Sequence, residues 1–390
     1  MKKVILKKSG EEKLKSYSQW VYTNEIKKAP KDILPGEVVE IFSSSGRFLG
    51  LGYYNPLSKI PLRVLTFFKR GDIRQLIRDR IKRAVEKRRK LHINSDAFRI
   101  VHSEGDFLPG LIVDYYSGYL SVQINTAGME NLREAIIDAL IENISPEGII
   151  DKSDEKVRKK EGLETENRVI YGAVPDVVRI NENGILFNVY LKEGQKTGFY
   201  LDQRENRKIV SSVVEGGFSV LDLFSNAGGF GIYAGKMGAS YITFVDISEK
   251  ALEQVRENCS LNEITDYTVV NQNAFDFLKE EVKSGNKYDL IILDPPSFAK
   301  TKSEKEGALR GFKYLILNSL KLLKENGYLA VFSCSYHVDM NDLLEVSASA
   351  STDTKIPVGV REFMYQDRDH PVLVNMPNTL YLKGLLLEKL

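Results

Sequence analysis

The stretch Val220 to Lys236, VLDLFSNAGGFGIYAGK, decides the fold of this chain. It begins as a short apolar run of strand composition, passes through small residues at 225–229, and continues in a helical pattern. Strand, glycine loop and helix form a nucleotide site in open α/β sheets, because glycines let a ligand approach the backbone and free N–H groups face it. The stretch therefore predicts a cofactor of the adenosine type.

A second apolar strand, Tyr241 to Val245, ends in Asp246, whose carboxylate could accept hydrogen bonds from both ribose hydroxyls. The glycines fall at Gly228, Gly229 and Gly231, which departs from the full dinucleotide fingerprint. This layout alone does not separate NAD from S-adenosylmethionine.

Two later strands also end in reactive residues. Tyr288 to Phe298 reads YDLIILDPPSF, and Tyr328 to Ser335 reads YLAVFSCS. The carboxyl ends of the strands converge on one crevice in a doubly wound sheet. We therefore expect one rim to gather Asp222, Asp246, Asp294 and Cys334.

The carboxyl-terminal half alternates strands with helices, which predicts a mostly parallel sheet of Rossmann-like type. Its predicted strands are Val220–Phe224, Tyr241–Val245, Thr268–Asn271, Leu290–Leu293 and Tyr328–Phe332. The last apolar segment, Leu380 to Lys389, is expected in an antiparallel hairpin at the edge of this sheet.

Bulk composition describes a globular chain of several domains. The chain of 390 residues is too long for a single hydrophobic core, so two or three domains are expected. Of its residues, 43% are hydrophobic and 28% charged. No apolar stretch approaches the length of a membrane span. Two cysteines, Cys259 and Cys334, provide neither a disulfide framework nor zinc spacing, so we expect a cytoplasmic protein with no metal.

Charge is distributed unevenly although the net charge is only +2. Residues 1–100 hold 24 Lys and Arg against 10 Asp and Glu, whereas the remainder is acidic. This favours contact between the amino-terminal quarter and a polyanion over a merely solvated basic face. Arg70 to His92 is predicted to form a basic amphipathic helix. The sequence is equally consistent with two roles for it, contact with phosphates and a solvated connection between domains.

Residues 1–70 read as a small β-rich unit, with strands at Gly36–Phe42, Phe48–Tyr54 and Pro61–Phe68. A mixed unit follows, with strands at 98–102, 110–116 and 119–125 and a helix at 129–144. The first unit resembles the PUA domain, an RNA-binding barrel. The residues that carry this resemblance are Gln19–Tyr22, Gly36–Val39 and Gly50–Pro56.

Asp-Pro-Pro-Ser-Phe at 294–298 resembles the Asp-Pro-Pro-aromatic fourth motif of S-adenosylmethionine-dependent methyltransferases that act on nucleobases. Ser-Cys-Ser at 333–335 resembles the nucleophile motif of RNA 5-methylcytosine methyltransferases. With SEGDFLPGLIVD at 103–114 and DEKVRKKEG at 154–162, the chain resembles the large-subunit ribosomal RNA cytosine-5 methyltransferases over essentially its whole length.

That resemblance implies three domains: a PUA-like domain at 1–70, an α+β connecting domain at 71–187, and a Rossmann-like S-adenosylmethionine-dependent methyltransferase domain at 188–390. It implies RNA as the partner, most specifically large-subunit ribosomal RNA. The sequence leaves the choice between a monomer and a homodimer open.

Residue chemistry and the resemblance together assign a set of candidate site residues. For the cofactor these are Lys196, Thr197, Phe199, Arg204, Asp222, Phe224, Ser225, Ala227, Gly228, Gly229, Asp246, Ser248, Asn273, Ala274, Asp294 and Pro295. For the target base they are Pro296, Ser297 and Phe298.

Cys334 is the predicted nucleophile and Asp294 the predicted partner of the base. Carbon 5 of cytosine is a weak nucleophile until a thiolate adds to carbon 6. An ordinary thiol, with a pKa of about 8.5, needs a nearby cation or helix amino terminus to ionise, and Lys196 is the candidate cation. Related enzymes often carry a second cysteine after the Pro-Pro pair, whereas this chain has Ser297, so the base that removes the carbon-5 proton is unassigned.

Two other interpretations stay open. The methyl group could go to a nitrogen of the base, in which case Cys334 would be dispensable. Alternatively the chain could be a non-catalytic RNA-binding or assembly protein, against which the intact glycine loop and its partner acids argue.

Overall fold

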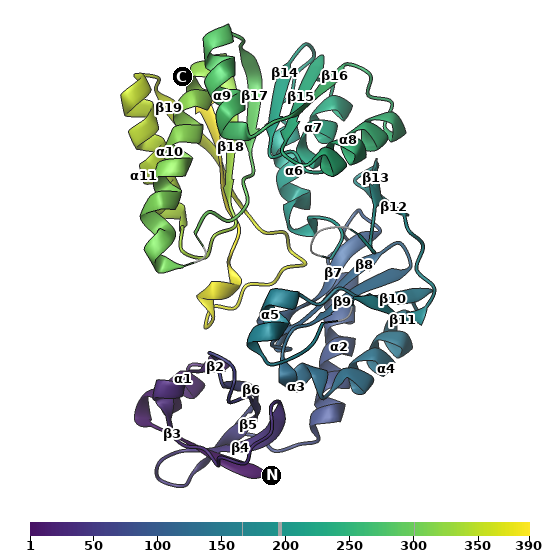
Figure 1. Ribbon diagram of the computed structural model, residues 1–390, viewed down its shortest axis with the longest axis vertical. Helices are drawn as coiled ribbons and strands as arrows, with labels where there is room; N and C mark the ends of the chain where they lie inside the picture. Colours follow the sequence, from purple (N-terminus) through teal and green to yellow (C-terminus); the bar gives the residue numbers. More distant parts are fainter. Residues whose placement is uncertain (166, 194–196, 300) are drawn as a thin grey trace. The chain divides into compact units, whose positions relative to one another are not determined.

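The computed structural model describes residues 1–390 except 166, 194–196 and 300, and the chain divides into compact units (Figure 1). Unit 1 comprises Met1–Ile180, Val189–Leu201 and Arg368–Thr379. Unit 2 comprises Asn181–Asn188, Asp202–Asp367 and Leu380–Leu390. The three-domain division predicted from the sequence stays a proposal.

The first sheet of unit 1 has the strand order β2-β6-β5-β4-β1-β3. The elements of this part are β1 Lys2–Leu6, α1 Lys8–Lys15, β2 Trp20–Val21, β3 Ile26–Lys28, β4 Glu37–Phe42, β5 Phe48–Tyr54 and β6 Leu62–Phe67. A Cβ atom at Gly50 would lie 2.0 Å from the Thr66 carbonyl oxygen, so β5 can approach β6 this closely only with glycine there. The three strands predicted at 36–68 are confirmed.

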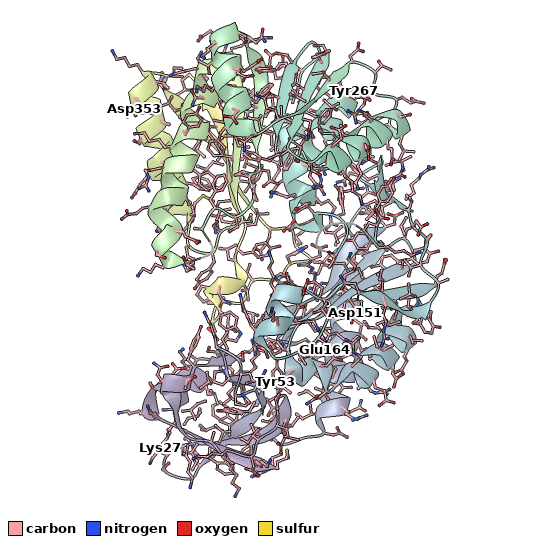
Figure 2. All side chains as sticks on the ribbon, in the orientation of Figure 1. Lys27, Tyr53, Asp151, Glu164, Tyr267 and Asp353 are labelled. Atoms are coloured by element: carbon pink, nitrogen blue, oxygen red, sulfur yellow. The ribbon has the colours of Figure 1, made fainter. Side chains whose placement is uncertain are left out.

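Tyr53 on β5 connects this sheet to the second part of unit 1 (Figure 2). Its ring is fully buried, and its hydroxyl donates to the Pro109 carbonyl oxygen at 2.6 Å. A Cβ atom at Gly128 would lie 2.0 Å from the ring, so the helix that carries this glycine fits only without a side chain. The two parts of unit 1 therefore meet in a packed interface.

The second sheet of unit 1 has the order β11-β10-β9-β8-β7. The elements are α2 Ile73–Arg89, β7 Ala97–His102, β8 Leu111–Tyr116, β9 Tyr119–Ile124, α3 Ala127–Glu130, α4 Arg133–Ile144, β10 Gly148–Asp151, α5 Glu155–Lys160 and β11 Arg168–Gly172. The helix predicted at 129–144 is interrupted, because Leu132 has non-helical dihedral angles (φ −108°, ψ 8°). The strands β12 Val178–Glu182 and β13 Ile185–Val189 pair with each other.

Helix α2 confirms the predicted amphipathic helix, but its basic residues have different environments. Ile77 and Ile81 are fully buried against the second sheet of unit 1. Arg88 is also buried, and its guanidinium donates two hydrogen bonds of 2.6 Å to the Asp106 carboxylate. It donates a third, of 2.8 Å, to the Asp369 carbonyl oxygen, so Arg88 serves the structure of unit 1 and is not available to a polyanion.

The sheet of unit 2 has the order β16-β15-β14-β17-β18-β20-β19. Its strands are β14 Ser219–Leu223, β15 Tyr241–Asp246, β16 Tyr267–Asn271, β17 Tyr288–Leu293, β18 Leu323–Ser333, β19 Val358–Tyr365 and β20 Lys383–Lys389. β14 to β18 pair in parallel, and β20 pairs antiparallel with β18 and β19, which confirms the predicted parallel sheet with an antiparallel hairpin. The strand order reverses between β14 and β17, where such sheets bind ligands.

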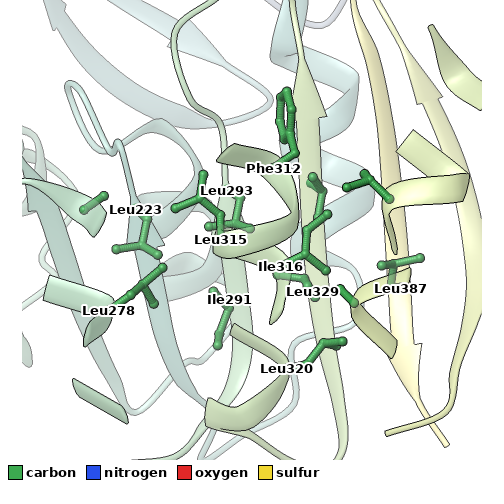
Figure 3. Close-up of a cluster of buried hydrophobic side chains, with 14 of the residues drawn as sticks. Leu223, Leu278, Ile291, Leu293, Phe312, Leu315, Ile316, Leu320, Leu329 and Leu387 are labelled. Carbon is green, nitrogen blue, oxygen red and sulfur yellow. The ribbon is translucent and has the colours of Figure 1, made fainter. Parts of the chain in front are cut away.

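Helices cover both faces of this sheet. They are α6 Arg204–Ser211, α7 Gly229–Lys236, α8 Glu249–Leu261, α9 Ala274–Ser284, α10 Lys305–Leu322 and α11 Met340–Thr354. Leu315, Ile316 and Leu320 of α10 pack on Ile291 and Leu329 of the sheet (Figure 3). Successive residues of a strand face opposite sides, so Phe244, which meets α7, lies on the other face from Val245. In the described part of the chain, no helix combines the length and apolarity needed to cross a membrane.

We predict that Arg88→Met destabilises unit 1 by about 3–5 kcal/mol, because it leaves the buried Asp106 carboxylate without its charge partner. Arg89→Met is the matched control, since the neighbouring Arg89 is exposed. Urea unfolding followed by circular dichroism measures both. Equal, small shifts of the two midpoints would contradict the structural role of Arg88.

Candidate functional site

The loop after β14 has an unusual backbone. Phe224 and Asn226 have positive φ angles of 61° and 47°, and Gly228, the residue before α7, has a φ of 80°. Such angles are uncommon for residues other than glycine and concentrate at ligand sites. The predicted glycine loop is thus a sharp turn that delivers the chain directly into α7.

Glycines also bring α7 close to the sheet and to α6. A Cβ atom at Gly231 would lie 2.3 Å from the Phe244 ring, and one at Gly229 would lie 3.1 Å from Arg207. Close packing places the first turn of α7 at the carboxyl ends of β14 and β15. Unpaired N–H groups of a helix start favour an anionic or polar ligand there.

Asp222 lies near the end of β14, just before the loop, with only 1% of its surface exposed. Its carboxylate accepts a hydrogen bond of 2.9 Å from the Gly231 N–H. Burial raises the pKa of Asp222 to about 7, with further contributions from the charges of Asp294 and Asp246, while the Gly231 hydrogen bond opposes the rise. Asp222 therefore links the end of β14 to the first turn of α7 and is partly protonated near neutral pH.

Asp246, at the end of β15, organises the neighbouring turns. One carboxylate oxygen accepts from the Asn226 N–H and the other from the Ser248 N–H, both at 2.9 Å. A carboxylate oxygen has two acceptor sites, so both oxygens can still accept from a ribose hydroxyl. Asn273 caps α9 through a hydrogen bond of 2.9 Å from the Phe275 N–H.

Ser225 provides a test of whether this loop fits an adenosine-type cofactor. The residue is 6% exposed, and its buried hydroxyl has no hydrogen-bond partner among the described residues. Buried polar atoms in proteins nearly always have a partner, and one without a partner in the protein suggests a bound molecule. The loop, its acids and this hydroxyl therefore suit a polar cofactor that approaches the backbone.

The Asp294 and Cys334 turns follow neighbouring parallel strands, because Leu293 of β17 pairs with Val331 of β18. Asp294 accepts a hydrogen bond of 3.1 Å from the Gln203 side chain. Ser297 and Ser335 connect the two turns through a hydroxyl–hydroxyl hydrogen bond of 2.9 Å. The structure therefore brings the predicted nucleophile and the predicted base partner to the same edge of the sheet.

Exposure distinguishes the two cysteines. Cys334 is half-buried, whereas Cys259 in α8 is fully buried, and burial raises the Cys259 pKa to about 12. Cys334 is thus the cysteine whose thiol a substrate could reach.

After Asp294, Pro295 is buried, Pro296 is exposed, and Phe298 packs with its ring centroid 5.2 Å from that of Phe312.

The predicted residues before the loop have separate locations. Lys196 lies outside the described residues. Thr197 and Phe199 belong to unit 1, where the Phe199 N–H donates to the Tyr116 hydroxyl at 3.2 Å. Arg204 begins α6 in unit 2 and is fully buried. Its guanidinium forms an ion pair with Asp367, with 2.5 Å between Nη2 and Oδ2. Contact of these residues with a cofactor stays a prediction.

The remaining candidates follow the strand ends of unit 2. Ala227 lies in the glycine loop and is buried. Ser248 caps α8 by accepting from the Ala251 N–H at 3.3 Å, and Ala274 is the first residue of α9.

Lys383 is a site residue that sequence reasoning missed. It begins β20, is 4% exposed, and its ammonium donates to the Ser335 carbonyl oxygen at 2.7 Å. The signal was a lysine within the apolar run LYLKGLLLEK, where strand pairing buries it beside the Ser-Cys-Ser turn.

Comparisons with known proteins agree with this geometry. Residues 4–67 match the PUA-like domain family, and residues 163–346 match the S-adenosylmethionine-dependent methyltransferase family. Proteins named ribosomal RNA large subunit methyltransferase I from Aeromonas salmonicida and Tolumonas auensis are each 38% identical, over 99% of this chain and 98% of their own length. A crystal structure described as a methyltransferase complexed with SAH has a TM-score of 0.86 over all of both chains at 24% identity, which shows the fold. The predicted fold class and the S-adenosylmethionine cofactor are confirmed.

Asp222→Asn is predicted to change the pH dependence of stability. The folded-state pKa of Asp222, about 7, lies above the ordinary carboxyl value, so its stabilising contribution is complete below about pH 4 and is lost as the pH rises through 7. Between pH 4 and pH 8 the wild type should lose about 2–4 kcal/mol relative to Asp222→Asn. Urea unfolding of both proteins at several pH values measures this difference, and parallel stability profiles would contradict the buried, protonated carboxyl.

Proposed function

The chain belongs to the family of S-adenosylmethionine-dependent methyltransferases named ribosomal RNA large subunit methyltransferase I, and we propose that it methylates carbon 5 of a cytosine in that RNA. The proposed reaction proceeds through a covalent adduct with Cys334. The observation that carries this proposal is a half-buried cysteine, Cys334, on the turn next to the Asp294 turn. Both turns lie at the carboxyl ends of the parallel strands, and the strand order reverses between β14 and β17, next to the Asp294 strand.

The proposed chemistry follows from the weak nucleophilicity of cytosine carbon 5. The Cys334 thiolate adds to carbon 6, which makes carbon 5 electron-rich enough to accept a methyl group. When bound, S-adenosylmethionine supplies that methyl group as a sulfonium electrophile. Loss of the carbon-5 proton then restores the ring double bond and releases the thiolate.

Asp294 is proposed to recognise the base. A cytosine presents nitrogen 3 and an exocyclic amine, and a carboxyl group can bond to both when it carries a proton. Gln203 donates to one Asp294 oxygen at 3.1 Å, which orients the carboxyl group. Pro295 and Pro296 stiffen the turn because their rings fix φ.

Ser297 occupies the place where related enzymes often have a second cysteine. Its hydroxyl is hydrogen-bonded to that of Ser335, next to Cys334. Ser297 or a water molecule held by these hydroxyls is therefore the proposed route for the carbon-5 proton.

RNA binding is proposed to involve unit 1, which contains the PUA-like match. Arg74 and Arg78 of α2 are paired with Glu134 and Asp138 of α4. A ribosomal RNA substrate would place the protein in the cytoplasm.

Cys334→Ala should lower methyl transfer by about 10³-fold or more, because the covalent step has no alternative nucleophile. The assay uses radiolabelled S-adenosylmethionine and large-subunit ribosomal RNA that lacks the modification, with mapping of 5-methylcytosine in the product. Cys259→Ala is the matched control and should retain turnover, since Cys259 is sealed in α8.

Near-normal turnover by Cys334→Ala would contradict the adduct and favour methylation of a base nitrogen. No methyl transfer by the wild type, together with no binding of S-adenosylmethionine, would favour a non-catalytic RNA-binding protein.

Replacement of Lys82, Arg83 and Lys87 by Gln should weaken RNA binding. These α2 side chains are exposed and have no ion pair within the part of the chain that the structure describes. Each lost phosphate contact lowers the slope of log affinity against log salt by about 0.7–0.9, so the triple variant should lose about 2 units.

Filter binding at several salt concentrations measures this slope. The control is a triple Gln variant of exposed lysines in unit 2, at Lys279, Lys283 and Lys321. An equal loss in both variants would show a general charge effect instead of an α2 contact.

A further inference from the structure

Lys383 has an unusual position for a lysine. Strand pairing fixes it opposite Ser333, the residue before Cys334. Its ammonium donates to the Ser335 carbonyl oxygen at 2.7 Å and to the Tyr381 carbonyl oxygen at 2.9 Å. A lysine ammonium has three protons, and these carbonyls are its acceptors among the described residues, so one proton remains for a further partner.

Burial of this cation requires compensation. Lys383 is 4% exposed, and an isolated charge at such a place is unfavourable unless acceptors or an opposite charge stabilise it. Carbonyl dipoles supply part of the stabilisation, while no carboxylate forms an ion pair with Lys383 in the described chain.

Electrostatics identifies the missing partner. Burial lowers the pKa of Lys383 to about 8, and the strongest opposing interaction comes from Cys334. Asp339 and Asp342, at the start of α11, contribute less, and Asp342 is already paired with Lys305 at 2.7 Å. Of the ionisable groups that act on this ammonium, a Cys334 thiolate would therefore favour its charged form most.

We propose that Lys383 is a positioning residue that fixes the Ser333–Ser335 turn through its hydrogen bond to the Ser335 carbonyl oxygen and stabilises the thiolate form of Cys334. The thiol proton passes to bulk water, Lys383 keeps its three protons, and the resulting ammonium–thiolate pair is present before substrate arrives. The Lys383 ammonium stabilises the thiolate again when the proposed bond between carbon 6 and sulfur breaks. This role rests on the proposed thiol chemistry.

The direct test is the pH dependence of Cys334 alkylation by iodoacetamide in the native full-length protein, followed by peptide mass spectrometry. An ordinary thiol has a midpoint near pH 8.5, and we expect the wild-type midpoint at least about one unit lower. Cys259, fully buried, should stay unmodified until the protein is unfolded and so serves as an internal control. A wild-type midpoint at or above about 8.5 would overturn the proposal without any variant.

Lys383→Gln removes the charge but keeps an amide that can donate to a carbonyl. Its midpoint should rise by about one unit or more, which corresponds to about tenfold slower alkylation at pH 7. The rate at high pH, where every thiol is ionised, should be unchanged, whereas a distorted turn would alter that rate as well. Lys383→Arg, which keeps the charge, should retain most of the lowered midpoint.

Lys389→Gln is the matched control on the same strand. Lys389 donates to the Leu323 carbonyl oxygen at 3.2 Å and to Glu325 at 2.8 Å, at the end of β20 far along the strand from Cys334. Its alkylation midpoint should equal that of the wild type.

The two proposals fail differently. Normal turnover by Cys334→Ala would remove the thiol chemistry, whatever the alkylation midpoint. An unshifted midpoint in folded Lys383→Gln, with Cys334→Ala inactive, would overturn the role of Lys383 alone.

Discussion

Strand pairing in the centre of unit 2 is the constraint on which the candidate site depends. β17 pairs in parallel with β14 on one side and with β18 on the other, and β18 pairs antiparallel with β20. Parallel pairing aligns the carboxyl ends, so Asp222, Asp294 and Cys334 reach the same edge although they are far apart in the sequence. Antiparallel pairing brings the beginning of β20, and with it Lys383, to that edge. A shift of one residue in any of these pairings would turn the side chains to the opposite face.

The same edge concentrates polar groups that are costly to bury. Asp222 and Lys383 are almost fully buried. Burial raises the pKa of Asp222 and lowers the pKa of Lys383, and both shifts favour the neutral form. Backbone groups offset part of this cost, since Asp222 accepts from Gly231 and Lys383 donates to Ser335. The sheet around them is apolar and closely packed, and such rigid packing is what can hold groups in unfavourable environments.

Basic residues of unit 1 divide between structure and surface. Arg88 is sealed against Asp106, and Arg99 bonds the Asp114 carboxylate at 2.7 and 2.8 Å, so neither charge faces solvent freely. Asp369, which lies in the chain between two stretches of unit 2, accepts from the Arg99 N–H at 2.8 Å within unit 1. The excess of positive charge counted along the sequence therefore overstates the charge that a polyanion could meet.

The sequence by itself determined the parallel sheet, the glycine loop, the amphipathic α2 and the antiparallel carboxyl-terminal hairpin. The individual strands and helices of these features follow from local periodicity and from glycine, which act over a few residues. The strand-end rule also predicted that Asp294 and Cys334 share one edge. Only the tertiary structure decided which polar residues are buried and what they contact: Asp222 bonds Gly231, Arg88 bonds Asp106, and Lys383 bonds the Ser335 carbonyl oxygen. Such contacts depend on pairing between distant segments, and a lysine or arginine in the sequence carries no mark of whether packing will remove it from water.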